Sequence, residues 1–103
     1  MRATPKPDPT DPAVIAYMTR NEADMAFKKR VQTIFEWVQP TDDMLILDMP
    51  CGRGFYLNMF RYVSHCELLG AELDWDVLQK AQRNVGSLPN VALHNTNIYA
   101  LPY

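Results

Sequence analysis

A glycine-containing loop between a short apolar segment and an amphipathic segment is the feature that most constrains the fold of this chain. Residues 44–47 are all apolar, Asp48 ends the run, and Gly52 and Gly54 follow within six residues. A short apolar run without alternation is typical of a strand in a parallel sheet that is buried on both faces. Glycines placed directly after such a strand let the backbone turn sharply and approach a ligand closely. The sequence therefore predicts a strand–loop–helix unit with a ligand site at the loop.

Helical and extended patterns alternate along the rest of the chain. The expected strands are residues 44–48, 67–73 and 91–94. The expected helices are residues 13–38, with an interruption near residues 20–22, then residues 55–63 and residues 75–85. Asp11 and Asp74 are predicted N-caps, and Gly86 is predicted to end its helix in the left-handed conformation. Strands that alternate with helices predict an α/β fold with right-handed crossovers and a parallel sheet.

Composition excludes several classes of protein. The chain has 103 residues, of which 48% are hydrophobic, and a formal net charge of −2. It is too apolar for a disordered protein, and its charge predicts no strong attraction to nucleic acid or an anionic membrane. No apolar run reaches the roughly 20 residues of a membrane helix. Two cysteines, Cys51 and Cys66, predict no disulfide framework and no metal site, so we expect a reduced, cytoplasmic setting. We expect residues 1–12 to be a proline-rich disordered tail and residues 13–103 to form one domain.

An acidic residue at the end of the second expected strand narrows the kind of ligand. Glu72 lies twenty residues after Gly52, the separation at which an acid in such a unit reaches the hydroxyls of a ribose. Loop and acid together predict a nucleoside-containing ligand. Leu57 stands where the dinucleotide fingerprint has its third glycine, which disfavours NAD. Asp48 suits a cofactor with a cationic amino group better than it suits a pyrophosphate.

Three segments resemble the motifs of one family. Residues 45–54 (LILDMPCGRG) are similar to the first motif of class I S-adenosylmethionine-dependent methyltransferases, a strand ending in Asp followed by a glycine loop. Residues 69–84 resemble the second motif of that family, and residues 90–103 resemble the third. The motifs occur in the family's order, and the resemblance covers residues 32–103. It implies a Rossmann-like three-layer sandwich with a parallel sheet, of which the chain supplies only the first three strands.

The resemblance also implies how S-adenosyl-L-methionine would be bound. Asp48 and the loop backbone would hold the methionine part, and Glu72 would bind the ribose hydroxyls. Leu73 would pack on the adenine ring, Asn97 would contact its amino group, and Ile98 would lie on the ring face. The cofactor-binding residues implied in this way are Asp48, Pro50, Cys51, Gly52, Gly54, Glu72, Leu73, Asn97 and Ile98.

Two positions depart from the family pattern. Pro50 replaces the first glycine of the loop and lacks an N–H donor, but it still permits the turn. Asn97 replaces the usual Asp and keeps an acceptor oxygen with less charge assistance. We interpret Cys51 as a packing residue rather than a nucleophile. Tyr17 and Arg20 are more typical of core or surface positions than of a lid over the site.

The implied activity is transfer of a methyl group to an acceptor, for which a small molecule is expected by analogy with the family. No catalytic residue is identified, and whether the chain is an enzyme stays open because it resembles only the N-terminal, cofactor-binding half of the fold. Two alternatives are a non-catalytic module that binds the cofactor or stabilises a partner, and a fragment of an NAD-binding oxidoreductase. The apolar strand at residues 44–48 would form an open sheet edge, which predicts a homo-oligomer or a missing partner chain.

Overall fold

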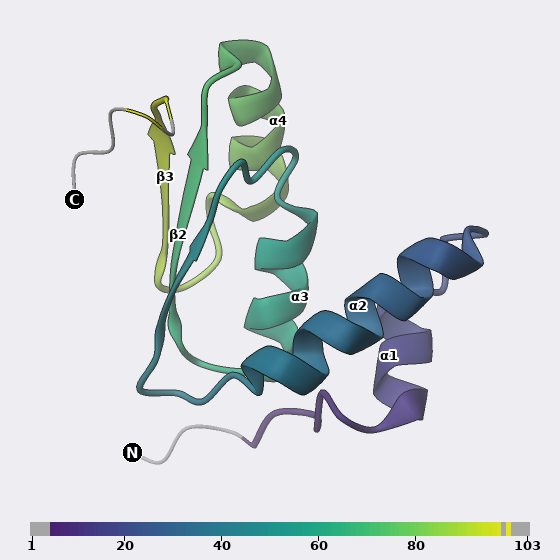
Figure 1. Ribbon diagram of the computed structural model, residues 1–103. Coiled ribbons are helices and arrows are strands. Elements are labelled where there is room, and N and C mark those ends of the chain that lie inside the picture. Colours follow the sequence, from purple (N-terminus) through teal and green to yellow (C-terminus); the bar gives the residue numbers. More distant parts are fainter. Residues whose placement is uncertain (1–4, 98, 100–103) are drawn as a thin grey trace.

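The computed structural model describes residues 5–97 and residue 99, and it contains a small α/β fold (Figure 1). Its helices and strands alternate from the first strand onward, as the sequence predicts. The elements are α1 Pro12–Met18, α2 Met25–Val38, β1 Leu45–Asp48, α3 Phe55–Val63, β2 Glu67–Glu72, α4 Trp75–Val85 and β3 Val91–Asn95. The expected interruption of the first helical segment is confirmed, because α1 ends before residues 20–22 and α2 begins after them.

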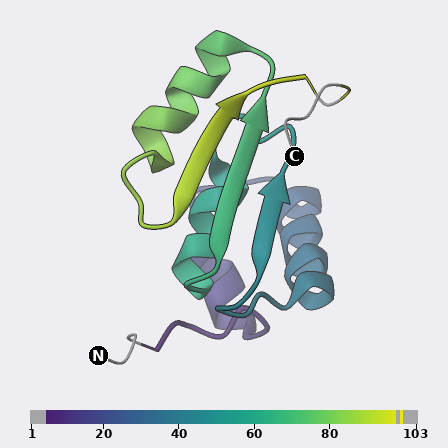
Figure 2. The ribbon, with the colours of Figure 1, turned by 90° about the vertical axis from the view of Figure 1, so that its left-hand side faces the viewer.

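The three strands form one parallel sheet in the order β1-β2-β3 (Figure 2). Leu47 is level with Leu69 on β2, which in turn is level with Ala92 on β3. Asp48 and Gly70 are register partners, so the carboxyl ends of β1 and β2 lie close together. The predicted α/β class with a parallel sheet is confirmed. β1 lies at an edge of this sheet, as expected.

The described helices lie on one face of the sheet, and the other face is bare of helices (Figures 1 and 2). Leu45 is 61% exposed and Leu47 is 38% exposed, whereas Ile46 between them packs against the core. The prediction that both faces of this strand are buried is therefore wrong. Successive side chains of a strand point to opposite faces, and only one face of β1 is covered. Residues 5–97 thus build two layers of a sandwich rather than three.

Aspartate side chains cap the N-termini of α1, α2 and α4. Asp11 accepts a hydrogen bond from the Ala13 N–H, and Asp74 accepts from the N–H groups of Asp76 and Val77. Both predicted N-caps are therefore confirmed, and Asp24 caps α2 in the same way.

The predicted helix end at Gly86 is confirmed, because α4 ends at Val85, but the left-handed conformation typical of a C′ glycine is not found. This residue ends α4 in the right-handed conformation, with a φ of −64°. A Cβ at Gly86 would overlap the side chain and carbonyl oxygen of Gln82. The glycine is therefore required here for close packing on α4 and not for a left-handed turn.

A continuous apolar core lies between the sheet and the helices. Phe35 of α2 and Phe60 of α3 stack with their ring centroids 4.7 Å apart, which joins these two helices. The fully buried large apolar side chains are Val31, Phe35, Leu57, Leu68 and Val85. None of the helices in residues 5–97 has the length and apolar character needed to cross a membrane.

Candidate functional site

The loop from β1 to α3 contains both glycines in conformations that L-residues rarely adopt. Gly52 has a φ of +55°, and Gly54, the N-cap of α3, has a φ of +89°. A Cβ at Gly54 would lie 2.9 Å from a methyl group of Val85, so α3 and α4 pack closely only because this residue is glycine. A Cβ at Gly52 would meet no atom within 4 Å. The loop is therefore packed on one side and open on the other.

The remaining loop residues hold the turn against the sheet. The Met49–Pro50 peptide bond is cis, and Pro50 is exposed. The Cys51 N–H donates a hydrogen bond of 2.8 Å to the Ala71 carbonyl oxygen, and the Gly54 N–H donates one of 3.0 Å to the Cys51 carbonyl oxygen. The first bond fixes the loop to the end of β2, and the second closes the turn within the loop. The turn thus forms with proline at the position where the family pattern has glycine.

Glu72, the last residue of β2, lies directly against the glycine loop. The Gly52 N–H donates a hydrogen bond of 3.1 Å to the Glu72 Oε1. The Asp74 N–H donates one of 3.0 Å to the Glu72 Oε2. Two backbone donors from different segments therefore hold the carboxylate in place beside the loop. A carboxylate can accept about four hydrogen bonds, so this one retains capacity for the hydroxyls of a ligand.

Asp48 and Glu72 together make this edge of the sheet acidic. Burial raises the pKa of Asp48 to about 6. Burial, together with the nearby charges of Asp48 and Glu72, raises the pKa of the Cys51 thiol to about 11. Both carboxylates therefore lie near the same buried thiol of the loop. A thiol with a raised pKa is a poor nucleophile, in agreement with a packing role for Cys51.

Asn95 completes the turn that follows β2. Its Nδ2 donates hydrogen bonds of 3.0 Å to the Glu72 carbonyl oxygen and 2.9 Å to the Leu73 carbonyl oxygen. These two bonds fix the backbone on which Glu72 and Leu73 are carried. The sequence does not predict this role for Asn95. An amide side chain directly after the third expected strand was visible, but only the register of the sheet shows that it is level with Glu72.

Of the three residues implied to bind adenine, the structure describes Leu73 and Asn97. The Leu73 side chain is 66% exposed, directly after Glu72. The Asn97 Oδ1 accepts a hydrogen bond of 2.8 Å from the Tyr99 N–H, so its acceptor oxygen already has a backbone partner. Ile98 lies outside the described residues. The structure therefore brings together Asp48, Cys51, Gly52, Gly54 and Glu72, with Pro50 in the same loop and Leu73 next to Glu72.

Aromatic side chains from α2 and α3 lie near the loop. The Phe27 ring lies 5.3 Å from the Phe55 ring and 6.3 Å from the Tyr56 ring, measured between centroids. Burial raises the pKa of Tyr56; the nearby charge of Arg30 acts against this shift, and that of Asp48 adds to it. Tyr56 is thus a polar group near Asp48 that the sequence analysis did not select. Its only signal was its place in the first turn after the glycines.

Tyr17 and Arg20 are not part of this loop site. The Tyr17 ring lies 5.5 Å from the Tyr62 ring, and the Arg20 guanidinium lies 4.1 Å from the centre of the Tyr17 ring. Tyr17 is half exposed and Arg20 is exposed, which agrees with surface roles.

The fold is similar to that of two solved structures. One is a geranyl diphosphate methyltransferase in complex with GPP and sinefungin, with a TM-score of 0.63 and 20% sequence identity; the match covers 100% of this chain and 41% of that one. The other is the PH0226 protein from Pyrococcus horikoshii OT3, with a TM-score of 0.57 and 20% identity; the match covers 88% of this chain and 41% of that one.

These similarities show a methyltransferase-like fold. The chain spans about two-fifths of the length of either protein. No protein-family model matches the sequence, and a search of curated proteins gives no significant match.

Proposed function

We propose that this chain is the cofactor-binding part of an S-adenosylmethionine-dependent methyltransferase. The observation that carries the proposal is the 3.1 Å hydrogen bond between the Gly52 N–H and the Glu72 Oε1. It joins the glycine loop to the acid that would bind a ribose. The neighbour of similar fold that was solved with sinefungin, an analogue of S-adenosylmethionine, supports the same cofactor class.

The charge of the site favours a cationic cofactor. Asp48 is partly buried, and burial raises its pKa to about 6, so its carboxylate gains from a positive partner. Glu72 adds a second carboxylate at the same loop. S-adenosylmethionine carries a sulfonium and an ammonium group, whereas the pyrophosphate of NAD is an anion that the Asp48 carboxylate would repel.

The packing of α3 also argues against NAD. Leu57 is fully buried, and its Cδ1 would lie 2.7 Å from a Cβ placed on Gly70 of β2. The Leu57 side chain therefore fills the space between helix and sheet. The dinucleotide fingerprint has glycine at this position because helix and strand must approach each other closely there.

Each cofactor-binding residue has a defined task in this proposal. Asp48 and the backbone at Gly52 and Gly54 bind and orient the methionine part. Glu72 binds the ribose hydroxyls, and the exposed Leu73 covers one face of the adenine. Asn97 contacts the adenine amino group once its Oδ1 is released from the Tyr99 N–H.

The bound cofactor supplies an electrophilic methyl group, and the transfer requires an acceptor placed in line with the sulfur–methyl bond. The task of the chain's own residues is therefore positioning. The acceptor is a small molecule by analogy with the family. The proposal assigns no catalytic base.

Calorimetric titration of the chain with S-adenosylmethionine, S-adenosylhomocysteine and NAD tests this proposal. We expect the two sulfur nucleosides to bind and NAD not to bind. Binding of NAD alone would support the oxidoreductase alternative, and binding of none of the three would overturn the cofactor assignment. Methylation assays with and without candidate partner proteins then separate a catalytic chain from a module that only binds the cofactor.

A further inference from the structure

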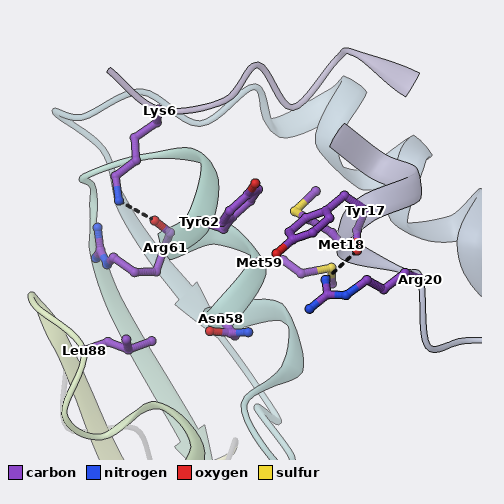
Figure 3. Close-up of a pocket in the computed structure, with 9 residues that line it drawn as sticks. All are labelled: Lys6, Tyr17, Met18, Arg20, Asn58, Met59, Arg61, Tyr62 and Leu88. Carbon is purple, nitrogen blue, oxygen red and sulfur yellow. Dashed lines mark hydrogen bonds between the residues drawn. The ribbon is translucent and has the colours of Figure 1, made fainter. Parts of the chain in front are cut away.

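A cavity of about 340 Å³ lies beside α3, away from the glycine loop (Figure 3). Its walls come from α1 and the turn that follows it, from α3, and from single residues near the N-terminus and before β3. This size is near the lower end of small-molecule pockets, which span roughly 300–1,000 Å³. None of the residues that hold Glu72 or shape the glycine loop lines it. The cavity is therefore separate from the proposed cofactor site.

Three cationic side chains line this cavity, and no acidic residue of the described chain does. They are Lys6, Arg20 and Arg61. The chain as a whole is acidic, with a formal net charge of −2, so this concentration of positive charge runs against its overall balance. A cavity lined by one sign of charge attracts ligands of the opposite sign.

Among the described residues, the buried charge of Arg61 is hydrogen-bonded to neutral groups. Its side chain is 6% exposed. Its guanidinium donates hydrogen bonds of 2.9 Å to the Ser64 carbonyl oxygen and 3.4 Å to the Asn90 carbonyl oxygen, and a third to that of Cys66. Its Nε has no hydrogen-bond partner among the described residues. The positive charge of such a buried cation is not neutralised by a carboxylate, and an anion in the adjoining cavity would stabilise it.

Lys6 and Arg20 are held at this cavity by carbonyl groups. The Lys6 Nζ donates a hydrogen bond of 3.1 Å to the carbonyl oxygen of Arg61. The Arg20 Nη1 donates one of 2.7 Å to the carbonyl oxygen of Tyr17. An ammonium and a guanidinium have more donors than these single bonds use. Both side chains therefore retain donors for an anionic ligand.

Apolar and aromatic groups form most of the rest of the wall. Tyr17 and Tyr62 stack with their ring centroids 5.5 Å apart, and the Arg20 guanidinium lies over the Tyr17 ring. Met18, Met59 and Leu88 add further apolar surface, and Asn58 contributes one polar side chain to the lining. Aromatic rings and thioethers adapt to flat or irregular apolar ligands. The wall thus fits an apolar body, while the three cations fit an acidic group.

We propose that this cavity is a second ligand site, which takes a small organic anion consisting of an apolar body and a carboxylate or phosphate group. Arg20, beside Tyr17, binds the acidic group directly, and Lys6, on the opposite side of the cavity next to Arg61, adds positive charge to the site (Figure 3). The buried charge of Arg61 adds to the positive potential around it, and the apolar body lies against Tyr17, Tyr62 and the methionines. This site does not depend on the identity of the cofactor at the glycine loop.

Nuclear magnetic resonance titration of the full chain with naphthoate tests this site. We expect shifts at the amides of residues 17–20, 58–62 and 88. Two control ligands should bind at least about tenfold more weakly. Naphthalenemethanol has the same ring system but no charged group, and inorganic phosphate has the charge but no apolar body. Arg20→Gln should weaken naphthoate binding about five- to tenfold by removing one charge-assisted contact.

The control is Lys80→Gln, which removes an exposed charge from α4 outside the cavity and should leave naphthoate affinity unchanged. Arg20 is exposed, so its replacement should preserve the fold, and the amide spectrum reports this directly. Equal binding of naphthoate and naphthalenemethanol would overturn the proposal. So would an unchanged affinity in Arg20→Gln, or shifts that map to Leu45 and Leu47 on the bare sheet face instead of the cavity.

Discussion

The backbone N–H of Gly52 donates a hydrogen bond of 3.1 Å to the Oε1 of Glu72, which lies twenty residues further along the chain. The bond crosses from the loop after β1 to the end of β2. It places a carboxylate next to the open side of the loop, where a Cβ on Gly52 would meet no other atom. The free backbone and the acid that the proposed function requires therefore share one small region.

Replacing Glu72 should weaken binding of the proposed cofactor. In Glu72→Ala, we expect the affinity for S-adenosylhomocysteine to fall at least about thirtyfold, because hydrogen bonds to a charged group contribute roughly 1.5–3 kcal/mol each. Calorimetric titration measures the change. Glu67→Gln is the matched control, since Glu67 is an exposed acid at the opposite end of the same strand and should leave the affinity unchanged. A Glu72→Ala variant that binds as tightly as the parent would remove the ribose assignment.

The two loop glycines should differ in their tolerance of alanine. Gly52→Ala places a Cβ in open space at a φ of +55°, and we expect a loss of about 1 kcal/mol in the free energy of unfolding from backbone strain alone. Gly54→Ala adds a contact of 2.9 Å with Val85 to similar strain, and we expect a loss of about 2–4 kcal/mol. Urea unfolding followed by circular dichroism compares the two variants. Equal losses would show that α3 and α4 separate easily at this point.

Asp48 should make the stability of the unliganded chain depend on pH. Burial raises its pKa from 3.8 to about 6, so the folded chain holds this proton more tightly than the unfolded chain does. The free energy of unfolding should therefore fall as the pH rises from about 4 to about 6, and stay lower above that range. Asp48→Asn removes this contribution. At neutral pH we expect the variant to be more stable than the parent by about 1 kcal/mol, less than the full shift implies because the carboxyl group still reaches water.

Thermal unfolding of parent and Asp48→Asn across this pH range tests the assignment. The difference between them should shrink toward the acidic end, where the carboxyl of the parent is protonated. A constant difference at all pH values would show that Asp48 does not titrate with a raised pKa. The same variant should bind S-adenosylmethionine more weakly than the parent, because the site loses its partner for a cation.

The bare face and the open edge of β1 should cause the chain to self-associate. Leu45 and Leu47 are exposed on a strand that pairs on one side only among the described residues. Exposed apolar edge strands pair with other chains. Sedimentation at increasing protein concentration should show species larger than the monomer, and the double variant Leu45→Lys, Leu47→Lys should shift the distribution toward the monomer. A monomeric mass at every concentration, with a melting temperature that does not depend on concentration, would contradict this prediction.

The part of the site that the sequence predicted follows from the geometry of parallel strands. Asp48 and Glu72 end neighbouring strands, so the carboxyl ends that carry them must meet at one edge of the sheet. The glycine positions could be located because only glycine tolerates the turn they form. The caps at Asp11 and Asp74 depend on local contacts over two or three residues and were equally readable.

The features that escaped prediction depend on contacts between distant segments. An apolar run does not reveal that helices cover only one face of its sheet, so the exposure of Leu45 was not foreseen. The bonds from Asn95 to the turn after β2 require the register of β3, which the sequence does not contain. The second cavity draws Lys6, Tyr62 and Leu88 from three separate parts of the chain, which only the fold brings together.

The position of β1 at the border of the sheet has a consequence for any segment that comes to lie beside it. A strand aligned with β1 in the same direction would end at the level of Asp48, and the residues following it would emerge next to the glycine loop. Such a neighbouring strand, whether from this molecule or another, would form one side of the proposed cofactor site and would also hydrogen-bond to β1. Binding of that neighbour and binding of the cofactor would then each raise the affinity of the other, so one titration would report on both.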